Sequence, residues 1–336
     1  MSLNSLEEIA SYIVSDGKGI LAADESNSTC TKRFDTIGVE STEESRRDYR
    51  EMLFTSGALQ DNIGGVILFD ETIRQHAKDG TSLVEIMNSH GALPGIKVDK
   101  GLQPIGESEE TVTVGLDGLD ERLKEYFELG AKFTKWRAVI KIGNNMPTDH
   151  CIDANMKALA DYAKIVQDNG MVPMVEPEVL MEGSHSIDDC FEVTDRSLKS
   201  LFHHLNKNEV NIKGTILKPN MVTAGATCSH QASINEVAQR TLDCLKANVP
   251  SELPAITFLS GGQSELLATA HLDAMNKIGG FNWKLSFSYG RALQAPTLKA
   301  WMGKPENVFI AQDALSHRAK MNKLAALGQW NEGLED

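Results

Sequence analysis

The sequence of 336 residues lacks the features that mark membrane, secreted and nucleic-acid-binding proteins. No apolar stretch approaches the roughly 20 residues that a membrane-spanning helix needs. The chain does not open with a basic segment followed by an apolar one, so we expect no signal peptide and a cytoplasmic location. The formal net charge of −14 argues against a nucleic-acid partner, because phosphate backbones are bound by basic surfaces. A few local lysines and arginines can still hold a small phosphorylated ligand.

Sequence patterns for disulfides, metals and nucleotides are also missing. The five cysteines are scattered and include no Cys-x-x-Cys, which favours free thiols over a disulfide framework or a zinc site. No His-Glu-x-x-His occurs, so we expect no metal cofactor. Leu-Ser-Gly-Gly-Gln (259–263) matches the signature of ABC-transporter ATPases, but the Walker A loop that such enzymes need is absent.

Short apolar runs recur at intervals of about 30 to 45 residues, with amphipathic, helix-like stretches between them. The runs, which we expect to be strands, are 19–23, 66–69, 95–99, 133–137, 171–175, 216–218, 255–259 and 284–288. The helix-like stretches are 43–59, 82–88, 119–129, 153–169, 186–205, 233–248, 263–276, 292–301 and 311–327. No linker or change in composition divides the chain, so we expect one domain over residues 1–336, with a short tail from about residue 328.

The runs are almost continuously apolar, as is typical of parallel strands that are buried on both faces of a sheet. This pattern predicts an α/β fold, a (β/α)8 TIM barrel. A doubly wound open sheet is the alternative, but its polar strand ends would not converge on one point. In a barrel the C-terminal strand ends form the active site. Polar or charged side chains at these ends are Asp24, Lys97, Asp99, Lys135, Arg137, Glu176, Glu178, Lys218, Ser260, Ser288 and Arg291.

Lys218 ends the run 216–218, just before Pro219. Burial at a strand end favours the neutral form of a lysine, which can attack a carbonyl and form a Schiff base. Lys135 at the same mouth would add to this effect, because like charges repel. The alternative for Lys218 is a stem that lies along the strand while the ammonium group reaches water. Asp24 and Glu176 are candidates for proton transfer, although carboxylates at strand ends often only cap the next helix.

Two turns, Ser-Gly-Gly (260–262) and Ser-Tyr-Gly-Arg (288–291), follow the last two strands and precede helices. In barrels this is the usual phosphate site, since glycine lets the backbone N–H groups of a helix N-terminus approach an anion. Lys97 and the region of Ser26, Thr29 and Arg33 would hold a second anion across the mouth. Two anion sites around a Schiff-base lysine predict a sugar bisphosphate with a ketone between its phosphates.

Seven segments of the sequence stand out for their combination of polar strand ends and glycine turns. They are Gly-Ile-Leu-Ala-Ala-Asp-Glu-Ser (19–26), Gly-Ile-Lys-Val-Asp-Lys-Gly (95–101), Lys-Trp-Arg (135–137), Val-Glu-Pro-Glu (175–178), Leu-Lys-Pro-Asn-Met-Val (217–222), Phe-Leu-Ser-Gly-Gly-Gln-Ser (258–264) and Phe-Ser-Tyr-Gly-Arg-Ala-Leu-Gln (287–294). Together they resemble the class I (Schiff-base) fructose-bisphosphate aldolase family. They occur in the family's order and cover nearly the whole chain to about residue 320.

The resemblance implies a role for each matching residue. The catalytic set is Lys218 as the Schiff-base lysine, Glu176 as the acid and base for dehydration and proton transfer, Asp24 as its partner near the cleaved bond, Lys135 in carbinolamine chemistry and Glu178 in the supporting network. The C1 phosphate would meet Ser260, Gly261, Gly290 and Arg291, and the C6 phosphate Lys97, Ser26 and Thr29. With their neighbours, the expected substrate-binding set is Lys97, Arg137, Ser26, Thr29, Arg33, Ser260, Gly261, Gly262, Ser288, Gly290 and Arg291.

The activity implied is reversible cleavage of fructose 1,6-bisphosphate to dihydroxyacetone phosphate and glyceraldehyde 3-phosphate, in glycolysis and gluconeogenesis, without a cofactor. The resemblance also implies a homotetramer. Animal members of the family end in a tail whose terminal tyrosine helps to protonate the enamine, whereas this sequence has no tyrosine after Tyr289. Two alternatives are an aldolase that prefers sedoheptulose 1,7-bisphosphate or fructose 1-phosphate, and a barrel that serves as a non-enzymatic scaffold for protein partners.

Overall fold

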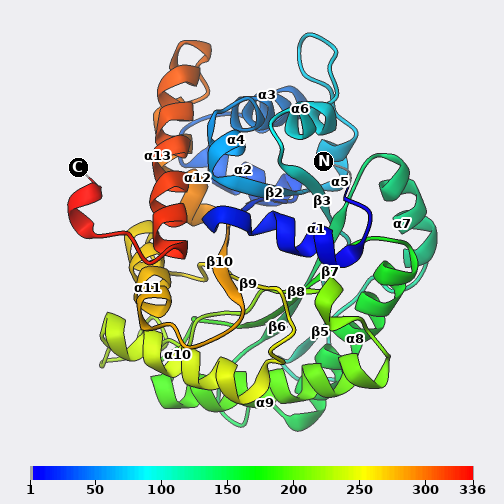
Figure 1. Ribbon diagram of the computed structural model, residues 1–336, viewed down its shortest axis with the longest axis vertical. Coiled ribbons are helices and arrows are strands. Elements are labelled where there is room, and N and C mark those ends of the chain that lie inside the picture. Colours follow the sequence, from blue (N-terminus) through cyan, green and yellow to red (C-terminus); the bar gives the residue numbers. More distant parts are fainter. Residues whose placement is uncertain (1–2, 336) are drawn as a thin grey trace.

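The computed structural model describes residues 3–335 as a closed barrel of parallel strands surrounded by helices (Figure 1). The strands follow one another around the barrel in the order β1-β10-β9-β8-β7-β6-β3-β2. Their bounds are β1 (Gly19–Ala23), β2 (Ile63–Leu68), β3 (Leu93–Lys97), β6 (Phe133–Ile140), β7 (Val172–Val179), β8 (Ile216–Leu217), β9 (Ala255–Phe258) and β10 (Lys284–Tyr289). The first strand pairs with the last, with Ile20 beside Ser288. The predicted (β/α)8 barrel is confirmed, and the open-sheet alternative is wrong.

Helices connect consecutive strands and cover the outside of the barrel (Figure 1). They are α1 (Leu6–Ile13), α2 (Asn27–Asp35), α3 (Glu43–Phe54), α4 (Ala58–Asp61), α5 (Asp70–Ile73), α6 (Leu83–Ser89), α7 (Leu119–Glu128), α8 (Asp149–Asp168), α9 (Ile187–Lys207), α10 (Ile234–Asn248), α11 (Glu265–Ile278), α12 (Arg291–Trp301) and α13 (Val308–Ala326). Short 3₁₀ turns are η1 (Ser15–Gly17), η2 (Ile212–Gly214), η3 (Pro305–Asn307) and η4 (Glu332–Leu334). None of the helices within residues 3–335 is both long and apolar enough to cross a membrane.

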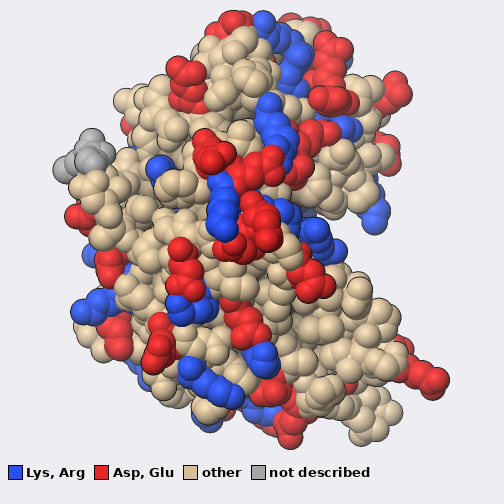
Figure 2. Space-filling view, turned by 90° about the vertical axis from the view of Figure 1, so that its right-hand side faces the viewer, with Lys and Arg blue, Asp and Glu red and all other residues tan. Residues whose placement is uncertain are grey.

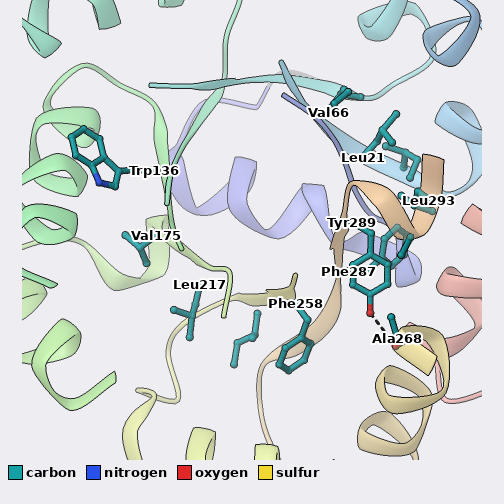
Figure 3. Packing of buried hydrophobic residues seen from close by; sticks show 14 of the residues in the cluster. Leu21, Val66, Trp136, Val175, Leu217, Phe258, Ala268, Phe287, Tyr289 and Leu293 are labelled. Atoms are coloured by element: carbon teal, nitrogen blue, oxygen red, sulfur yellow. Dashed lines mark hydrogen bonds between the residues drawn. The ribbon is translucent and has the colours of Figure 1, made fainter. Parts of the chain in front are cut away.

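Alternation along each strand divides its side chains between the barrel interior and the layer of helices. On β6, Trp136 points outward and packs on Tyr162 of α8 with ring centroids 5.4 Å apart. Lys135 and Arg137 point the other way and line the mouth of the barrel. The outward residues of the other strands, among them Leu21, Val66, Val175, Leu217 and Phe258, continue this layer around the ring (Figure 3).

Helix α1 closes the end of the barrel opposite the mouth (Figure 1). Its Ile9, Ala10 and Ile13 are buried against Ile20 and Phe133 in the barrel interior. Ser5 begins the helix with a capping box, in which its hydroxyl accepts from Glu8 N and the Glu8 side chain bonds back to Ser5 N. We did not predict this helix, although Ile9, Ala10 and Ile13 have helical spacing and Ser5-x-x-Glu8 is a capping-box pattern.

Several boundaries differ from the prediction. Strand β7 runs on through Glu176 and Glu178, so these side chains lie within the strand and not after it. The predicted helix over 43–59 divides into α3 and α4. A short hairpin of β4 (Leu102–Pro104) and β5 (Thr111–Thr113), absent from the prediction, follows β3. The longer β7 pairs with β6 as far as Val179, which lies beside Ile140, and the Val179 N–H also donates to Oδ1 of Asn220.

The predicted C-terminal tail begins directly after α13, and its described residues pack against the barrel's outer helices. The backbone N–H of Trp330 donates to Oδ1 of Asp273 at 3.0 Å, and Lys277 donates to the Trp330 carbonyl at 2.8 Å. Arg318 forms an ion pair with Glu335. Residues 328–335 are therefore held on α11 and α13.

Acidic and basic residues lie next to one another on the surface. Figure 2 shows the side that carries α7 and α8, where neither sign forms a large area of its own. Pairs four residues apart on these helices, such as Lys124 with Asp120 and Lys157 with Asp161, contribute to this mixture. On this side of the molecule, acidic residues therefore do not form a separate patch.

Candidate active site

A cavity of about 390 Å³ opens at the C-terminal end of the barrel strands. Fourteen of the sixteen predicted site residues line it: Asp24, Ser26, Thr29, Arg33, Lys97, Lys135, Arg137, Glu176, Glu178, Lys218, Ser260, Gly261, Ser288 and Gly290. The other two, Gly262 and Arg291, lie beside it. Strands far apart in the sequence thus bring the predicted chemistry to one point.

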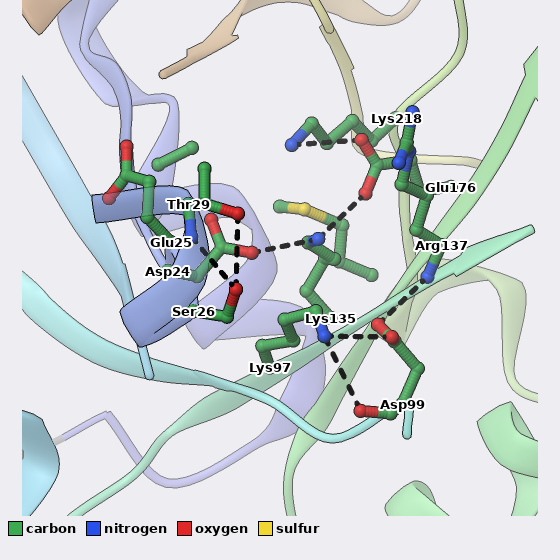
Figure 4. Close-up of polar contacts among 12 residues, drawn as sticks. Asp24, Glu25, Ser26, Thr29, Lys97, Asp99, Lys135, Arg137, Glu176 and Lys218 are labelled. Carbon is green, nitrogen blue, oxygen red and sulfur yellow. Dashed lines mark hydrogen bonds and ion pairs between the residues drawn. The ribbon is translucent and has the colours of Figure 1, made fainter. Parts of the chain in front are cut away.

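Four buried ionisable groups form a continuous chain at the floor of the cavity (Figure 4). The Nζ of Lys218 is 3.1 Å from Oε1 of Glu176. The other carboxylate oxygen, Oε2, is 3.2 Å from Nζ of Lys135. Lys135 also reaches Oδ2 of Asp24 at 2.8 Å. The side chains of the two lysines and of Glu176 are at most 5% exposed, so the groups interact with little screening by water.

Neighbouring strands fix this geometry. Lys135 on β6 and Glu176 on β7 lie on adjacent parallel strands, whose register pairs Arg137 with Glu176. Lys218 directly follows β8, and its backbone N–H donates to the Val175 carbonyl of β7 at 2.8 Å. Each side chain is therefore placed by a backbone ladder, which is more rigid than a loop.

Neighbouring opposite charges determine which of these ion-paired side chains carry a proton. Burial works against the charged form of Lys135, but the carboxylates of Asp24 and Glu176 outweigh it and raise its pKa. Burial also works against the charged form of Asp24, and here Lys135 and then Lys218 prevail and lower its pKa. The pKa of Glu176 is lowered against burial by the same two lysines. Both carboxylates are therefore ionised at neutral pH and available as proton acceptors.

Two further ion pairs line the wall of the cavity. Arg137 pairs with Glu178. Lys97 lies 2.9 Å from Oδ1 of Asp99 (Figure 4). The side chain of Arg137 is 40% exposed, so its guanidinium group is accessible from the cavity. Lys97 and Arg137 therefore offer positive charge near the mouth, each with an acidic partner that fixes its position.

The predicted phosphate turn after β9 has the expected backbone shape. Gly261 and Gly262 have φ of +21° and +79°, in the region that favours glycine. Gln263 N–H donates to the Ser260 carbonyl at 2.9 Å and closes the turn. Gly261 faces the cavity, whereas Gly262 packs near Met181.

The N-terminus of α12 lies on the same side of the cavity. Gly290 is its N-cap, and no side chain hydrogen-bonds to its first N–H groups. The buried hydroxyl of Ser288 faces the cavity and makes no hydrogen bond within residues 3–335. Unpaired helix N–H groups beside a free hydroxyl form a suitable site for a phosphate.

Arg291 differs from its predicted position. Its side chain lies in a neighbouring groove between α2 and α12, where Nη2 donates to the Gln263 carbonyl at 3.0 Å. Its backbone still begins α12. The sequence places Arg291 at the strand end, but the direction of a long side chain depends on such tertiary contacts.

The opposite side of the cavity is built by the start of α2. Ser26 is its N-cap, and its Oγ lies 3.0 Å from Oγ1 of Thr29 (Figure 4). Arg33, one helical turn further, forms an ion pair with Glu25. Glu25 lines the cavity and was missed, although it directly follows Asp24 in the sequence. Its position after a strand end was the available signal.

The site offers no arrangement for a metal ion. Within residues 3–335, no three or more His, Cys, Asp or Glu side chains gather in a way that could hold one. The carboxylates of Asp24 and Glu176 are paired with lysines. The arrangement instead suits covalent chemistry at a lysine amine with carboxylates to move protons.

Known proteins are similar to this chain in sequence and in fold. The family model described as fructose-bisphosphate aldolase class-I matches residues 5–336. A protein of Xanthomonas axonopodis named probable fructose-bisphosphate aldolase class 1 is 55% identical over 332 residues, which cover 98% of this chain and 99% of that protein. The Arabidopsis thaliana protein named fructose-bisphosphate aldolase 4, cytosolic, is 52% identical over 95% of this chain and 82% of its own length.

Among solved structures, fructose-bisphosphate aldolase from Plasmodium falciparum, in a ternary crystal structure with TRAP and a small-molecule inhibitor, superposes with a TM-score of 0.96. The two are 47% identical, and the match covers 98% of this chain and 95% of the other. The matches extend over almost the full length on both sides. The chain therefore belongs to the class-I fructose-bisphosphate aldolase family.

Proposed function

We propose that this protein cleaves fructose 1,6-bisphosphate reversibly to dihydroxyacetone phosphate and glyceraldehyde 3-phosphate, through a Schiff base on Lys218. The observation that carries the proposal is the ion-paired chain from Lys218 through Glu176 and Lys135 to Asp24. It joins a nucleophilic amine to two proton acceptors in a cavity that also offers two sides suited to phosphate.

The reaction begins when the neutral amine of Lys218 attacks the C2 ketone and forms a carbinolamine. Glu176, whose Oε1 is 3.1 Å from the Lys218 Nζ, accepts the proton that Lys218 loses on becoming the neutral amine. It then gives this proton to the leaving hydroxyl, so that water departs and an iminium ion remains. Lys135 holds Glu176 and Asp24 in place and balances their charge.

The iminium ion then accepts the electron pair of the C3–C4 bond as that bond breaks. Asp24 or Glu176 takes the proton of the C4 hydroxyl, and glyceraldehyde 3-phosphate leaves. Protonation of the enamine at C3 and hydrolysis of the imine release dihydroxyacetone phosphate and restore Lys218. Glu178 supports the site through its pair with Arg137.

The two phosphates bind on opposite sides of the mouth in this proposal. The C1 phosphate meets Ser260, Gly261, Ser288, Gly290 and Arg291, and the C6 phosphate meets Lys97, Arg137, Ser26, Thr29 and Arg33. Gly262, which packs near Met181, contributes to the shape of the turn. Arg291 needs to turn from the Gln263 carbonyl to reach the first phosphate, which a rotamer change allows. The free Ser288 hydroxyl is the strongest local support for an anion on that side.

Borohydride trapping with fructose 1,6-bisphosphate tests the proposal. We expect a stable adduct on the peptide that contains Lys218, and activity that EDTA leaves unchanged, because class I chemistry uses the imine in place of a metal. An adduct on Lys135 would exchange the roles of the two lysines. The absence of any adduct in folded protein would favour the scaffold alternative, and a higher kcat/KM for sedoheptulose 1,7-bisphosphate or fructose 1-phosphate would change the preferred substrate.

We further propose that the protein is a cytoplasmic homotetramer in which each chain folds as one domain. Relatives from Arabidopsis thaliana and Pisum sativum are named as cytosolic or cytoplasmic proteins, which supports the location. Light scattering should give four times the 36.8 kDa of one chain. Unfolding of each chain in a single transition would support one domain.

A further inference from the structure

The amide of Gln294 joins three elements behind the active site. Gln294 lies on α12 and is 1% exposed. Its Nε2 donates to the Ala22 carbonyl at the end of β1, at 2.7 Å, and to Oε1 of Glu25 at 2.8 Å. Its Oε1 lies 3.1 Å from the hydroxyl of Tyr49 on α3, which donates to it. A single buried amide therefore uses both ends to fix the start of α12 against β1 and α3.

Glu25 carries this contact to the cavity. Its Oε1 also pairs with Arg33, and its Oε2 lies 2.6 Å from Nη2 of Arg50. The side chain of Glu25 is 5% exposed, whereas that of Arg33 is 27% exposed and lines the cavity. Glu25 is thus a buried carboxylate that holds one arginine at the cavity surface and another behind it.

We propose that Gln294 is a positioning residue for the C6-phosphate side of the site, which acts by fixing Glu25 and, through it, Arg33. This inference rests on the proposed function. Gln294 is not among the residues that line the cavity with Lys218, so it does not touch the substrate there. Its effect reaches the phosphate only through the Glu25 carboxylate.

The physical reason is the geometry that a guanidinium group needs. Arginine recognises phosphate through a planar fork of N–H groups, and a small misplacement of that fork weakens both hydrogen bonds. Without the Gln294 amide, Oε1 of Glu25 keeps only its pair with Arg33, and the carboxylate can rotate about its pair with Arg50. Arg33 then loses its fixed position, while Lys218 and Glu176 keep theirs.

Helix α12 packs closely on the end of β1, near the hydrogen bond between Gln294 and the Ala22 carbonyl. A Cβ added at Gly290 would lie 3.3 Å from the Ala22 oxygen, the same carbonyl that accepts from Gln294. The amide therefore anchors the first turn of α12 at its point of closest approach to β1.

The test compares two substrates that differ only in the 6-phosphate. In Gln294→Met, which keeps the side-chain length and removes the hydrogen bonds, we expect the KM for fructose 1,6-bisphosphate to rise about tenfold. The kcat and KM for fructose 1-phosphate should stay within about twofold, because this substrate has no phosphate for Arg33. A general loss of folding would instead impair both substrates alike.

Asn322→Leu is the matched control. Asn322 is another fully buried amide, which accepts from Thr269 and donates to the Arg318 carbonyl on α13, outside the cavity. We expect this variant to lower the melting temperature and to leave the ratio of the two kcat/KM values unchanged. Tyr49→Phe gives a milder second test, because it removes only the donor to Oε1 of Gln294. The ratio of kcat/KM for fructose 1,6-bisphosphate to kcat/KM for fructose 1-phosphate should fall about two- to threefold.

An equal loss on both substrates in Gln294→Met, or an unchanged ratio in Tyr49→Phe if the first variant does not fold, would overturn the inference. A wild-type protein that neither cleaves fructose 1,6-bisphosphate nor forms a borohydride adduct would overturn the proposed function, and this inference with it. The wild-type measurement therefore separates the two failures.

Discussion

The carboxylate of Glu176 lies within 3.1 Å of the amine of Lys218, and both side chains are almost completely buried. A carboxylate at this distance can exchange protons with the amine or with a hydroxyl formed next to it. The same contact also fixes the direction from which a carbonyl can approach Lys218. The proposed chemistry depends on this pair more than on any other contact in the cavity.

Replacing Glu176 with glutamine should therefore lower kcat by a factor of about 10² to 10⁴, since the amide keeps the shape and loses the proton acceptor. KM should change by a few-fold at most, and the borohydride adduct on Lys218 should form more slowly. Steady-state kinetics and the rate of trapping measure the two effects. Glu182→Gln, an exposed change in the loop after β7, is the control. A fully active Glu176→Gln enzyme would exclude Glu176 as the acid and base.

Lys135→Met should shift the acid limb of the pH profile. Lys135 lowers the pKa of Asp24 and of Glu176 against the effect of burial, so its removal raises the pKa of both carboxylates. They then become protonated at higher pH, and kcat/KM should fall at a higher pH than in the wild type. Lys141→Met, a half-exposed lysine paired with Glu109 just beyond β6, should leave the acid limb in place.

The same variant, Lys135→Met, should also lose folding stability at a higher pH than the wild type. A carboxylate with a lowered pKa stabilises the native state fully above its ordinary value, 3.8 for Asp24, and this contribution is lost as the pH falls through the lowered value. In Lys135→Met the loss should begin at a higher pH, so the midpoint of acid unfolding should rise. Circular dichroism during acid titration measures this midpoint. An unchanged midpoint and an unchanged acid limb together would show that Lys135 does not set these charges.

Ser288→Ala and Ser286→Ala should separate binding from stability. Both serines are buried on β10, but only Ser286 has a partner, the Lys18 carbonyl at 2.7 Å. Ser288→Ala should raise the KM for fructose 1,6-bisphosphate about tenfold and leave the free energy of unfolding unchanged, because no internal hydrogen bond is lost. Ser286→Ala should lower the free energy of unfolding by about 1 kcal/mol and leave KM unchanged. If the two variants behave alike, Ser288 does not contact the phosphate.

Gly64→Ala should destabilise the closed end of the barrel. A Cβ at Gly64 would lie 2.0 Å from the Ile13 carbonyl oxygen, so β2 and α1 would have to separate. We expect the free energy of unfolding to fall by about 1 to 3 kcal/mol or more in urea titrations. Gly57→Ala is the matched control, because no atom lies within 4 Å of its added Cβ and its backbone is helical. Equal stability of the two variants would contradict the close packing of α1.

The architecture could be predicted because each strand is a continuous apolar run that ends in a polar residue. Lys218, Lys135 and Glu176 were predicted to meet because parallel strands present their C-terminal ends at one mouth. The hairpin of β4 and β5 could not be, since its two three-residue strands carry little periodicity. Helix α1 was missed although its capping box and its apolar face were readable from the sequence. They are stabilised by contacts with distant parts of the chain.

The site shows the same division. Residues that contact the cavity from a strand end could be named from the sequence. The proposed positioning role of Gln294 could not be predicted, because its partners Ala22 and Tyr49 are distant in the chain. The side-chain direction of Arg291 likewise depends on the Gln263 carbonyl. The roles of the individual site residues stay predictions.

The pairing of β1 with β10 has a consequence for biosynthesis. The barrel closes only when β1 pairs with β10, where Ile20 lies beside Ser288. During synthesis the sheet therefore keeps two open edge strands until β10 has left the ribosome. Until then β1 and the newest strand expose backbone N–H and C=O groups that another nascent chain can pair with. We therefore expect chains truncated before β10 to aggregate or to be retained by chaperones, while the complete chain escapes both.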